Sequence, residues 1–359
     1  MIGFGREKGL VGLDIGSNSI KAVELNPRKK DDLYSYEVKK IGYELLPRDA
    51  IVEGTIIDSS AVVEKIKMIF DENKISNKNV AIAISGNSVI IKKISLPNME
   101  TEELAESIIW EAKHNIPYPY EETNVDYAIL RPSHESADKN LDILLVAAKK
   151  DKIANYSNVV NQARKNLEAI EVDVFALQNS LEVNCPNVLR EKTVVVINIG
   201  ANITNLIIIE KGIPQLFRDL SLGGYFFAEN LSKDLNISFD DAEKAIKGLP
   251  VQSISAEQLE ASLHTNVENL LEEIEKTFTF YEAGEKQERK IEQIFLSGGL
   301  SKLKDLTLYF ERKFNIKTEI FNPFQKIYLD EKKFDPMFSQ ELAALFGVAT
   351  GIATRKIEK

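Results

Sequence analysis

Five residues near the start of the chain have the types and spacing needed to hold a phosphate and a divalent cation. They lie in the segment VGLDIGSNSIKAVEL (11–25): Asp14, Gly16, Ser17, Asn18 and Lys21. The segment predicts a strand, a tight turn and a second strand, because the residues beyond the turn are strand formers without helical spacing. The Asp14 carboxylate would hold Mg²⁺ through waters, and Lys21 would reach a phosphate as a point charge.

A second copy of this pattern lies in the middle of the chain. The segment VVINIGANITNLIII (195–209) aligns with the first without a gap, which places Asn198 on Asp14. Its turn residues are Gly200, Ala201 and Asn202. One such hairpin is as often an ordinary β-turn, but two in the same register favour a clamp whose backbone N–H groups approach phosphates from both sides.

The hairpin pattern differs from the two commoner phosphate loops, which lead from a strand into a helix. The chain has no G-x-x-x-x-G-K-[ST] and no G-x-G-x-x-G after a predicted strand. A third glycine turn, Gly298 and Gly299 in QIFLSGGLSKLKDL (293–306), would let the backbone lie flat against a purine and ribose.

Composition bounds the class of protein. The chain has 359 residues, 44% hydrophobic and 28% charged, which predicts an ordinary globular protein of two domains. A net charge of -10 disfavours nucleic acid as a partner. A single cysteine, Cys185, excludes an intrachain disulfide and fits the cytosol, and no apolar run is long enough to predict a membrane span. The three histidines, His114, His134 and His264, lie far apart and predict no zinc site.

Periodicity places strands and helices around these motifs. The predicted strands are 34–46, 51–57, 79–86, 141–150 and 170–176. The predicted helices are 59–73 with Ser59 as N-cap, 151–167, 177–183, 225–247, 257–283 and a small-residue helix at 339–354.

The landmarks in this order resemble the actin-like ATPase superfamily over nearly the whole chain. They are 11–25 and 195–209 as phosphate motifs, 175–183 and 342–353 as connecting helices, and 293–306 as the adenosine motif. The stretch ISLPNMETEELAESIIWEAKHNIPYPYEETNVDYAIL (94–130) closely resembles the PilM family of type IV pilus assembly proteins, in its L-P-x-M start, W-E-A centre and I-P-[YF]-P exit.

This resemblance implies an α/β fold, the actin-like (ribonuclease H-like) two-domain fold with a duplicated core. The first domain would comprise 1–79, 146–192 and 335–359, and the second 193–334. An inserted subdomain of the FtsA and PilM type would span 80–145. In its helix, Trp110 is predicted to be core in preference to a partner contact, and Pro117 to Tyr120 form an exit turn or a groove wall.

The resemblance also implies ATP and Mg²⁺ as ligands and adds site residues. Gly223 and Gly224 match a nucleoside-side loop, and Glu243 and Lys247 match a pair reaching the ribose or purine, with a surface salt bridge as an equal alternative. Two candidates to orient an attacking water are Asp173 and Gln178, the latter favoured as a solvent-facing helix residue.

PilM proteins hold the cytoplasmic N-terminal tail of the membrane protein PilN in a groove beside the insert. The resemblance therefore implies a cytoplasmic adaptor in pilus assembly and twitching motility, recruited to the inner membrane by its partner, with other platform and motor proteins as further candidate partners. Asn198 departs from the superfamily's usual Asp, and an amide contributes less to Mg²⁺ binding and to polarising water, so hydrolysis should suffer more than ATP binding.

Three alternatives share this fold. A phosphotransferase such as a sugar kinase needs a catalytic Asp facing a sugar pocket, and no strong candidate is present. An FtsA-like filament or cell-division protein would carry an amphipathic membrane-targeting helix, for which the end ATRKIEK is too short and too charged. A type II secretion platform domain would be fused to a membrane span. The sequence favours an ATP-binding adaptor with slow or no hydrolysis.

Overall fold

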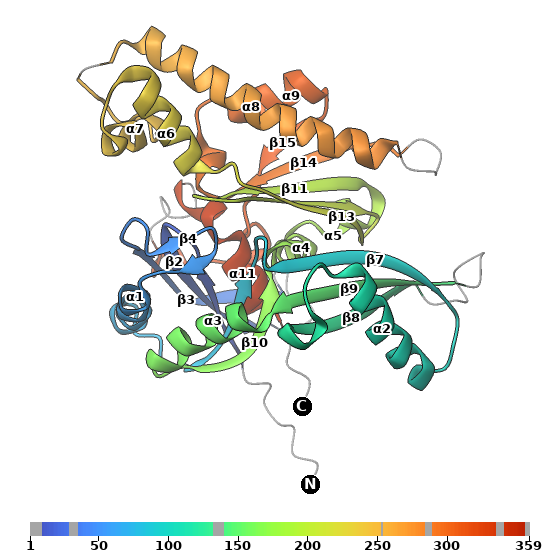
Figure 1. Cartoon of the computed structure of the whole chain (residues 1–359). Helices are drawn as coiled ribbons and strands as arrows, with labels where there is room; N and C mark the ends of the chain where they lie inside the picture. The colour runs from blue at the N-terminus through green and yellow to red at the C-terminus, as the bar shows by residue number, and fades with distance from the viewer. Residues whose placement is uncertain are drawn as a thin grey trace.

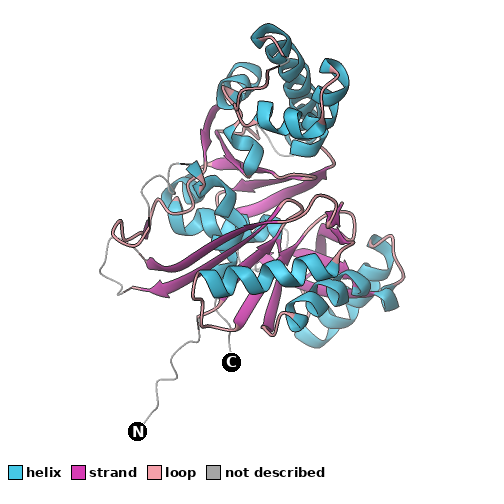
Figure 2. Ribbon diagram, turned by 90° about the vertical axis from the view of Figure 1, so that its left-hand side faces the viewer, coloured by secondary structure: helices cyan, strands magenta, loops and turns pink. Residues whose placement is uncertain are grey.

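Three β-sheets organise the chain into two lobes and an insert. The computed structural model describes residues 9–28, 35–131, 140–252, 254–283, 289–334 and 341–355. One lobe lies above the other in Figure 1, and the insert lies beside the lower lobe. A view turned by 90° shows that the helices of the upper lobe cover the side of its sheet that faces away from the lower lobe (Figure 2).

The first lobe is built on a six-stranded sheet in the order β10-β6-β1-β2-β3-β16. Its strands are β1 (Val11–Ile15), β2 (Ser19–Pro27), β3 (Tyr36–Leu45), β6 (Asn79–Ile84), β10 (Asn166–Val172) and β16 (Ile327–Tyr328). β1, β2 and β3 are antiparallel neighbours, whereas β6 runs parallel to β1 and to β10. The hairpin of β1 and β2 therefore lies at the centre of the sheet.

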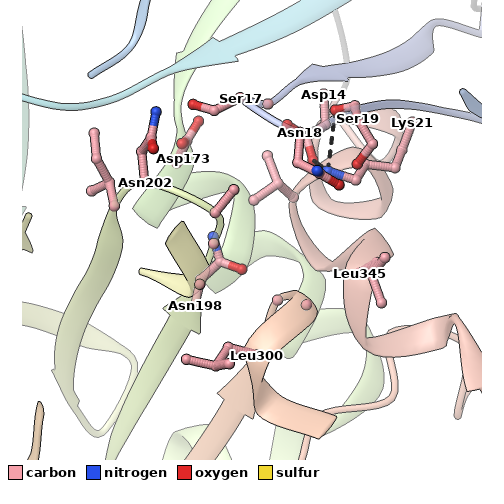
Figure 3. Close-up of a pocket in the computed structure, with 18 of the residues that line it drawn as sticks. Asp14, Ser17, Asn18, Ser19, Lys21, Asp173, Asn198, Asn202, Leu300 and Leu345 are labelled. Atoms are coloured by element: carbon pink, nitrogen blue, oxygen red, sulfur yellow. Dashed lines mark hydrogen bonds and ion pairs between the residues drawn. The ribbon is translucent and has the colours of Figure 1, made fainter. Parts of the chain in front are cut away.

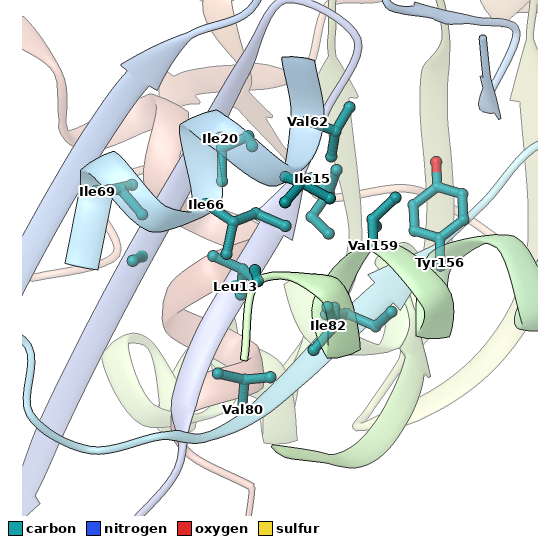
Figure 4. Close-up of a cluster of buried hydrophobic side chains, with 14 of the residues drawn as sticks. Leu13, Ile15, Ile20, Val62, Ile66, Ile69, Val80, Ile82, Tyr156 and Val159 are labelled. Carbon is teal, nitrogen blue, oxygen red and sulfur yellow. The ribbon is translucent and has the colours of Figure 1, made fainter. Parts of the chain in front are cut away.

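Helices α1 (Ser59–Glu72) and α3 (Lys150–Gln162) cover one face of this sheet (Figure 4). The apolar positions predicted to share one face of α1 are all buried: Val62, Val63, Ile66, Ile69 and Phe70. Burial of each such side chain stabilises the fold by about 1.5–3 kcal/mol. The predicted N-cap is wrong by one residue, because Asp58 caps the helix by accepting a hydrogen bond from the Ala61 N–H at 3.0 Å.

The second lobe is built on a five-stranded sheet in the order β13-β12-β11-β14-β15. Its strands are β11 (Thr193–Ile199), β12 (Thr204–Glu210), β13 (Ile213–Leu220), β14 (Gln293–Ser297) and β15 (Lys317–Ile320). Its helices are α6 (Gly224–Leu235), α7 (Phe239–Ile246), α8 (Ala256–Glu282) and α9 (Leu306–Phe314). The predicted single helix at 225–247 is two helices, because Asn236 is left-handed at φ 50° and ends α6, and Ser238 caps α7.

The insert is a three-stranded sheet in the order β7-β9-β8, with one helix packed on it. Its elements are β7 (Val89–Pro97), α2 (Thr101–Asn115), β8 (Thr123–Arg131) and β9 (Asn140–Lys149). Leu104, Ile108 and Ala112 are buried, whereas Trp110 is 58% exposed, so the prediction of Trp110 as a core residue is wrong. At 100° per residue, Trp110 points away from the i, i+4 stripe that contacts the sheet.

The sheets differ from the predicted domain boundaries at three points. β6 pairs with β1 and β10 and belongs to the first sheet, not to an insert that begins at 80. The sheet of the insert continues to Lys149, beyond the predicted end at 145. β16 pairs with β3 of the first sheet, although 327–328 fell in the predicted second domain. The remaining division into domains stays a prediction.

Two helices cross between the lobes, α4 (Asp173–Asn184) and α11 (Gly347–Ala353), and α11 follows the short helix η3 (Ala343–Phe346). A Cβ at Gly351 would lie 1.6 Å from the Ala176 carbonyl oxygen, so glycine allows the two backbones to touch. The predicted strand at 170–176 is too long, because β10 ends at Val172 and α4 begins at Asp173.

The remaining short elements connect these parts. They are β4 (Ile51–Val52), β5 (Thr55–Ile56), η1 (Tyr120–Glu122), α5 (Pro186–Glu191) and η2 (Gly299–Lys302). Among the described residues, no helix combines the length and apolar character needed to cross a membrane.

Candidate functional site

A cavity of about 500 Å³ lies between the two lobes and has the size of a small-molecule site. The predicted site residues that line it are Asp14, Gly16, Ser17, Asn18, Lys21, Asp173, Asn198, Gly200, Ala201, Asn202, Gly224, Glu243, Lys247, Gly298 and Gly299. Figure 3 shows Asp14, Asn18 and Lys21 at the upper right, Asp173 and Asn202 at the upper left, and Asn198 below them. The fold thus brings together motifs that lie far apart in the sequence.

The first hairpin closes with a two-residue turn. The Gly16 N–H donates to the Ser19 carbonyl at 3.1 Å, so Ser17 and Asn18 form the tip. Asp14 and Lys21 are cross-strand partners, and their carboxylate and ammonium form an ion pair at 3.2 Å. Both side chains are largely buried, and each neutralises the other at the edge of the cavity.

The second hairpin repeats this geometry. The Gly200 N–H donates to the Ile203 carbonyl at 3.0 Å, which leaves Ala201 and Asn202 at the tip. Asn198 occupies the position of Asp14 and pairs across the strands with Asn205, to which its amide donates at 3.2 Å. The internal repeat is therefore a repeat of structure, with an amide pair in place of an ion pair.

Two glycines press against the second turn. Gly298 has φ of 86°, and a Cβ there would lie 2.4 Å from the Ile199 carbonyl oxygen. A Cβ at Gly223 would lie 2.4 Å from the Ala201 carbonyl oxygen. Gly223 supports the turn from behind and does not line the cavity, unlike its neighbour Gly224. A Cβ at Gly299 would meet nothing within 4 Å.

Hydrogen bonds join the lobes around the cavity. The Asn18 amide donates to the Tyr225 hydroxyl at 3.1 Å, and the Asn202 amide donates to the Ile51 carbonyl at 3.3 Å. The Arg48 guanidinium lies 3.5 Å from the ring centroid of Phe239, a cation–π contact between the lobes. These contacts hold the lobes together with the cavity between them.

Asp173, at the first position of α4, is a cavity carboxylate whose affinity for a proton is raised. Burial, then the negative charge of Asp14, raise its pKa to about 7, although a hydrogen bond from Ser85 opposes the shift. A carboxyl with this pKa is suited to exchange a proton near neutral pH. The other predicted candidate, Gln178, lies outside the cavity, because its amide donates to the Gly212 carbonyl at 3.1 Å.

Glu243 of α7 and Lys247, which directly follows that helix, form the salt bridge that the sequence left open, and their contact with a ribose or purine stays a prediction. Lys247 and Glu243 approach to 4.0 Å and also line the cavity. The Lys247 side chain is 60% exposed, so it lies at the mouth and contributes little as an isolated ion pair.

Several polar residues at or near the site were not singled out from the sequence. Tyr156 and Tyr225 line the cavity. Lys152 donates a hydrogen bond to the carbonyl of the lining residue Ser85, and Asp219 accepts one from the N–H of the next residue, Gly86. None belongs to a motif that was recognised in the sequence. Lys152 and Tyr156 lie one turn apart on α3, Asp219 lies on β13 and Tyr225 on α6. Burial lowers the pKa of Lys152 and raises that of Tyr156.

The polar groups that line the cavity fit a nucleotide better than a bare metal ion. Within the described ranges, no group of three or more His, Cys, Asp or Glu side chains could hold a metal. A single carboxylate beside two open turns suits Mg²⁺, which keeps most of its waters and takes its remaining ligands from phosphates. His114 stacks on Trp110 and His264 meets Tyr309, both outside the cavity, and His134 lies outside the described residues.

Comparison with solved structures defines the class of protein. A structure described as the PilM-PilN type IV pilus biogenesis complex matches with a TM-score of 0.86 and 25% identity, covering 98% of this chain and all of that chain. The ethanolamine utilization protein EutJ from Carboxydothermus hydrogenoformans matches at 0.57 and 13% identity, covering 98% and 92%. MreB5 of Spiroplasma citri bound to ADP matches at 0.51 and 16% identity, covering 96% and 94%. The fold is that of the actin-like ATPases, as predicted.

The family is defined by the sequence over almost its whole length. The family described as type IV pilus assembly protein PilM matches residues 12–357. This chain belongs to the PilM family, and the resemblance found in residues 94–130 is confirmed. The process in which it takes part is type IV pilus assembly.

Proposed function

We propose that this chain is an ATP-binding adaptor of the type IV pilus assembly platform, cytoplasmic and recruited to the inner membrane by its partner PilN. The observation that carries the proposal is membership of the PilM family, in a chain whose two glycine turns face one cavity. MreB5, which shares the fold, has been solved with ADP and with AMPPNP.

The residues of the two turns account for how a nucleotide would be held. The N–H groups of Gly16 and Gly200 close their own hairpins, so the N–H groups at the tips, Ser17–Asn18 and Ala201–Asn202, are the candidates for phosphate oxygens. Asp14 would hold a hydrated Mg²⁺, which neutralises phosphate charge. The Lys21 ammonium would then be shared between Asp14 and the phosphates.

Slow or absent ATP hydrolysis is part of the proposal. Asn198 faces the cavity where its counterpart in the first hairpin carries a charge, and its amide is already engaged with Asn205. Asp173 is the residue best placed to orient a water, because its carboxyl lies in the cavity and its pKa of about 7 leaves it partly protonated at neutral pH. Any turnover would therefore depend on Asp173.

The partner proposed for the insert is the N-terminal cytoplasmic tail of PilN. A structure described as a PilM-PilN complex matches this chain with a TM-score of 0.86 and is covered along all of its length. Type IV pilus platform and motor proteins are further candidates. Among the described residues of the insert, Ile109 and Trp110 expose apolar surface beside each other on α2.

One experiment tests both ligands. Trp110 is the only tryptophan of the chain and lies exposed on the insert, so its fluorescence reports binding there. A synthetic N-terminal PilN peptide without tryptophan, from the same organism, should change Trp110 emission and co-elute with the protein, and Mg·ATP should bind by calorimetry. A scrambled peptide of the same composition is the control. Absence of peptide binding together with sugar-dependent ATP consumption would replace the adaptor by a phosphotransferase.

A further inference from the structure

A chain of hydrogen-bonded side chains crosses the second sheet from the cavity to its far edge. The Asn198 amide donates to Asn205 at 3.2 Å, and the Asn205 amide donates to one Asp219 oxygen at 2.8 Å. The three residues lie on the adjacent strands β11, β12 and β13. The cavity residue Asn198 is thus connected to the edge strand β13.

The chain of hydrogen bonds continues out of the second lobe. The other Asp219 oxygen accepts a hydrogen bond from the Gly86 N–H at 2.7 Å. Gly86 has φ of 86° and begins the turn between β6 of the first sheet and β7 of the insert. The preceding carbonyl, that of Ser85, accepts from the Lys152 ammonium, and Lys152 is only 7% exposed. The Ser85–Gly86 peptide is therefore held by a cation of the first lobe and an anion of the second.

The same edge strand contacts the neighbouring parts at two further points. The rings of Phe217 on β13 and Phe175 on α4 meet edge-on, with centroids 5.4 Å apart. The Lys93 ammonium of β7 donates to the Gln215 side chain at 3.1 Å. β7 lies beneath β13 in Figure 1, so the edge of the second sheet faces the first strand of the insert.

We propose that β13, through the Asp219–Gly86 hydrogen bond, couples occupancy of the cavity to the position of the insert. This inference rests on the proposed function and names its regulation. A ligand that accepts a hydrogen bond from the Asn198 amide, or moves that side chain, changes the hydrogen bond from Asn198 to Asn205. Because Asn205 donates to Asp219, the change reaches the carboxylate that holds Gly86. The proposal requires that the hydrogen bonds of Asn198 and of Asp219 differ between two states of β13, which is the physical condition for coupling.

Coupling of this kind acts in both directions. If Mg·ATP changes the affinity of the insert for a PilN peptide by a given factor, the peptide changes the affinity for Mg·ATP by the same factor. Couplings of this class are roughly 5–150-fold. Asp219 is a positioning residue in this scheme, because it contacts neither ligand.

The test compares Asp219→Ala with Arg218→Ala by hydrogen–deuterium exchange of residues 86–97. Arg218 is adjacent on β13, points to the opposite face of the sheet and pairs with Glu273 of α8 at 3.8 Å, so it is the matched control. Without nucleotide, Asp219→Ala should exchange faster around Gly86 than either the wild type or Arg218→Ala. Mg·ATP should change exchange in 86–97 of the wild type and the control, and leave Asp219→Ala unchanged. Asp219→Asn, which keeps the side-chain volume, replaces the alanine variant if that variant does not fold.

Each outcome separates this inference from the function on which it rests. If the wild type fails to bind Mg·ATP, the proposed function falls and the regulation falls with it. If Mg·ATP binds and residues 86–97 of Asp219→Ala respond as in the wild type, only the coupling through β13 is overturned. Loss of the response in Asp219→Ala, with nucleotide affinity kept within about threefold, supports the coupling.

Discussion

The two hairpins can be compared strand by strand, because each is followed by a third antiparallel strand in the same register. The side chains aligned across the three strands are Asp14, Lys21 and Tyr43 in the first lobe and Asn198, Asn205 and Asp219 in the second. We call each of these two sets of cross-strand partners a row. Each row contains one acidic residue, Asp14 in the first and Asp219 in the second. In the first row it lies on the inner strand at the cavity, and in the second it lies on the outer strand at the insert.

This difference separates two tasks that a symmetric pair of hairpins would share. The first row keeps its charge beside the cavity, balanced by Lys21, and is suited to Mg²⁺ and phosphate. The second row presents neutral amides to the cavity and uses its charge to hold Gly86. The duplicated fold therefore has one hairpin suited to ion chemistry and one suited to positioning.

The largest expected effect is on stability, at Gly298, which packs against the second hairpin turn. Gly298→Ala combines a left-handed φ with a Cβ placed 2.4 Å from a backbone oxygen, so it should lower the free energy of unfolding by about 3 kcal/mol or more. Gly299→Ala is the matched control, because its Cβ would meet nothing within 4 Å. Urea unfolding measures both, and equal stability of the two variants would contradict the close packing inferred at Ile199.

The pKa of Asp173 depends on the acidic residue of each row, because the negative charges of Asp14 and Asp219 both raise it. The folded-state pKa of about 7 exceeds the ordinary 3.8, so the folded protein binds the proton more tightly and loses that stability as pH rises from 4 to 7. Asp173→Asn should match the wild type near pH 4 and be more stable by a few kcal/mol above pH 7, because each tenfold change in proton affinity corresponds to ~1.4 kcal/mol. Unfolding curves that run parallel across this range would show that Asp173 titrates normally.

Nucleotide binding tests the charge asymmetry of the rows directly. Asp14→Ala should weaken Mg·ATP by ~10–100-fold, the loss typical of a residue that orients the ligands of a metal. Asn198→Ala should weaken it less, because it removes no charge from the cavity. Gln178→Ala, outside the cavity, should leave the affinity unchanged. Calorimetry measures all three, and an unchanged affinity in Asp14→Ala would refute the clamp.

Restoring an acid to the second row should make the hairpins more alike. Asn198→Asp gives both rows a carboxylate at the cavity, which should speed phosphate release from Mg·ATP several-fold. A tenfold faster rate would correspond to an activation free energy lower by about 1.4 kcal/mol. The rate should also depend more steeply on Mg²⁺. A rate no higher than that of the wild type would mean that slow turnover has another cause.

The smallest expected effect lies at the mouth of the cavity. Lys247→Ala removes an exposed ion pair with Glu243, and such pairs contribute about 0.2–1 kcal/mol. Nucleotide affinity should therefore fall by less than about fivefold. Glu243→Ala should lower the nucleotide affinity by the same factor if the pair acts as a unit. A large loss of affinity in only one of the two variants would indicate that its side chain contacts the nucleotide directly.

Much of the fold and of the cavity could be predicted from local pattern. Alternation and glycine spacing located both hairpins, and the apolar stripe of α1 was predicted residue by residue. The start of α4 was predicted wrongly as a strand. Val172 precedes the helix and Val174 and Phe175 lie in it, and these strand-forming residue types hide a helix that depends on packing between the lobes. Trp110 was misplaced because the broad apolar face of α2 does not reveal which part of it contacts the sheet.

The sequence by itself determined the duplicated hairpins, the loss of a charge at Asn198 and the family, because these depend on residue types at short spacing. Only the tertiary structure decided that Lys21 pairs with Asp14, that Gln178 lies outside the cavity and that Asp219 reaches Gly86. Gly86 and Asp219 are 133 residues apart along the chain. Contacts between such distant positions follow from how sheets and helices pack, and no local pattern encodes them.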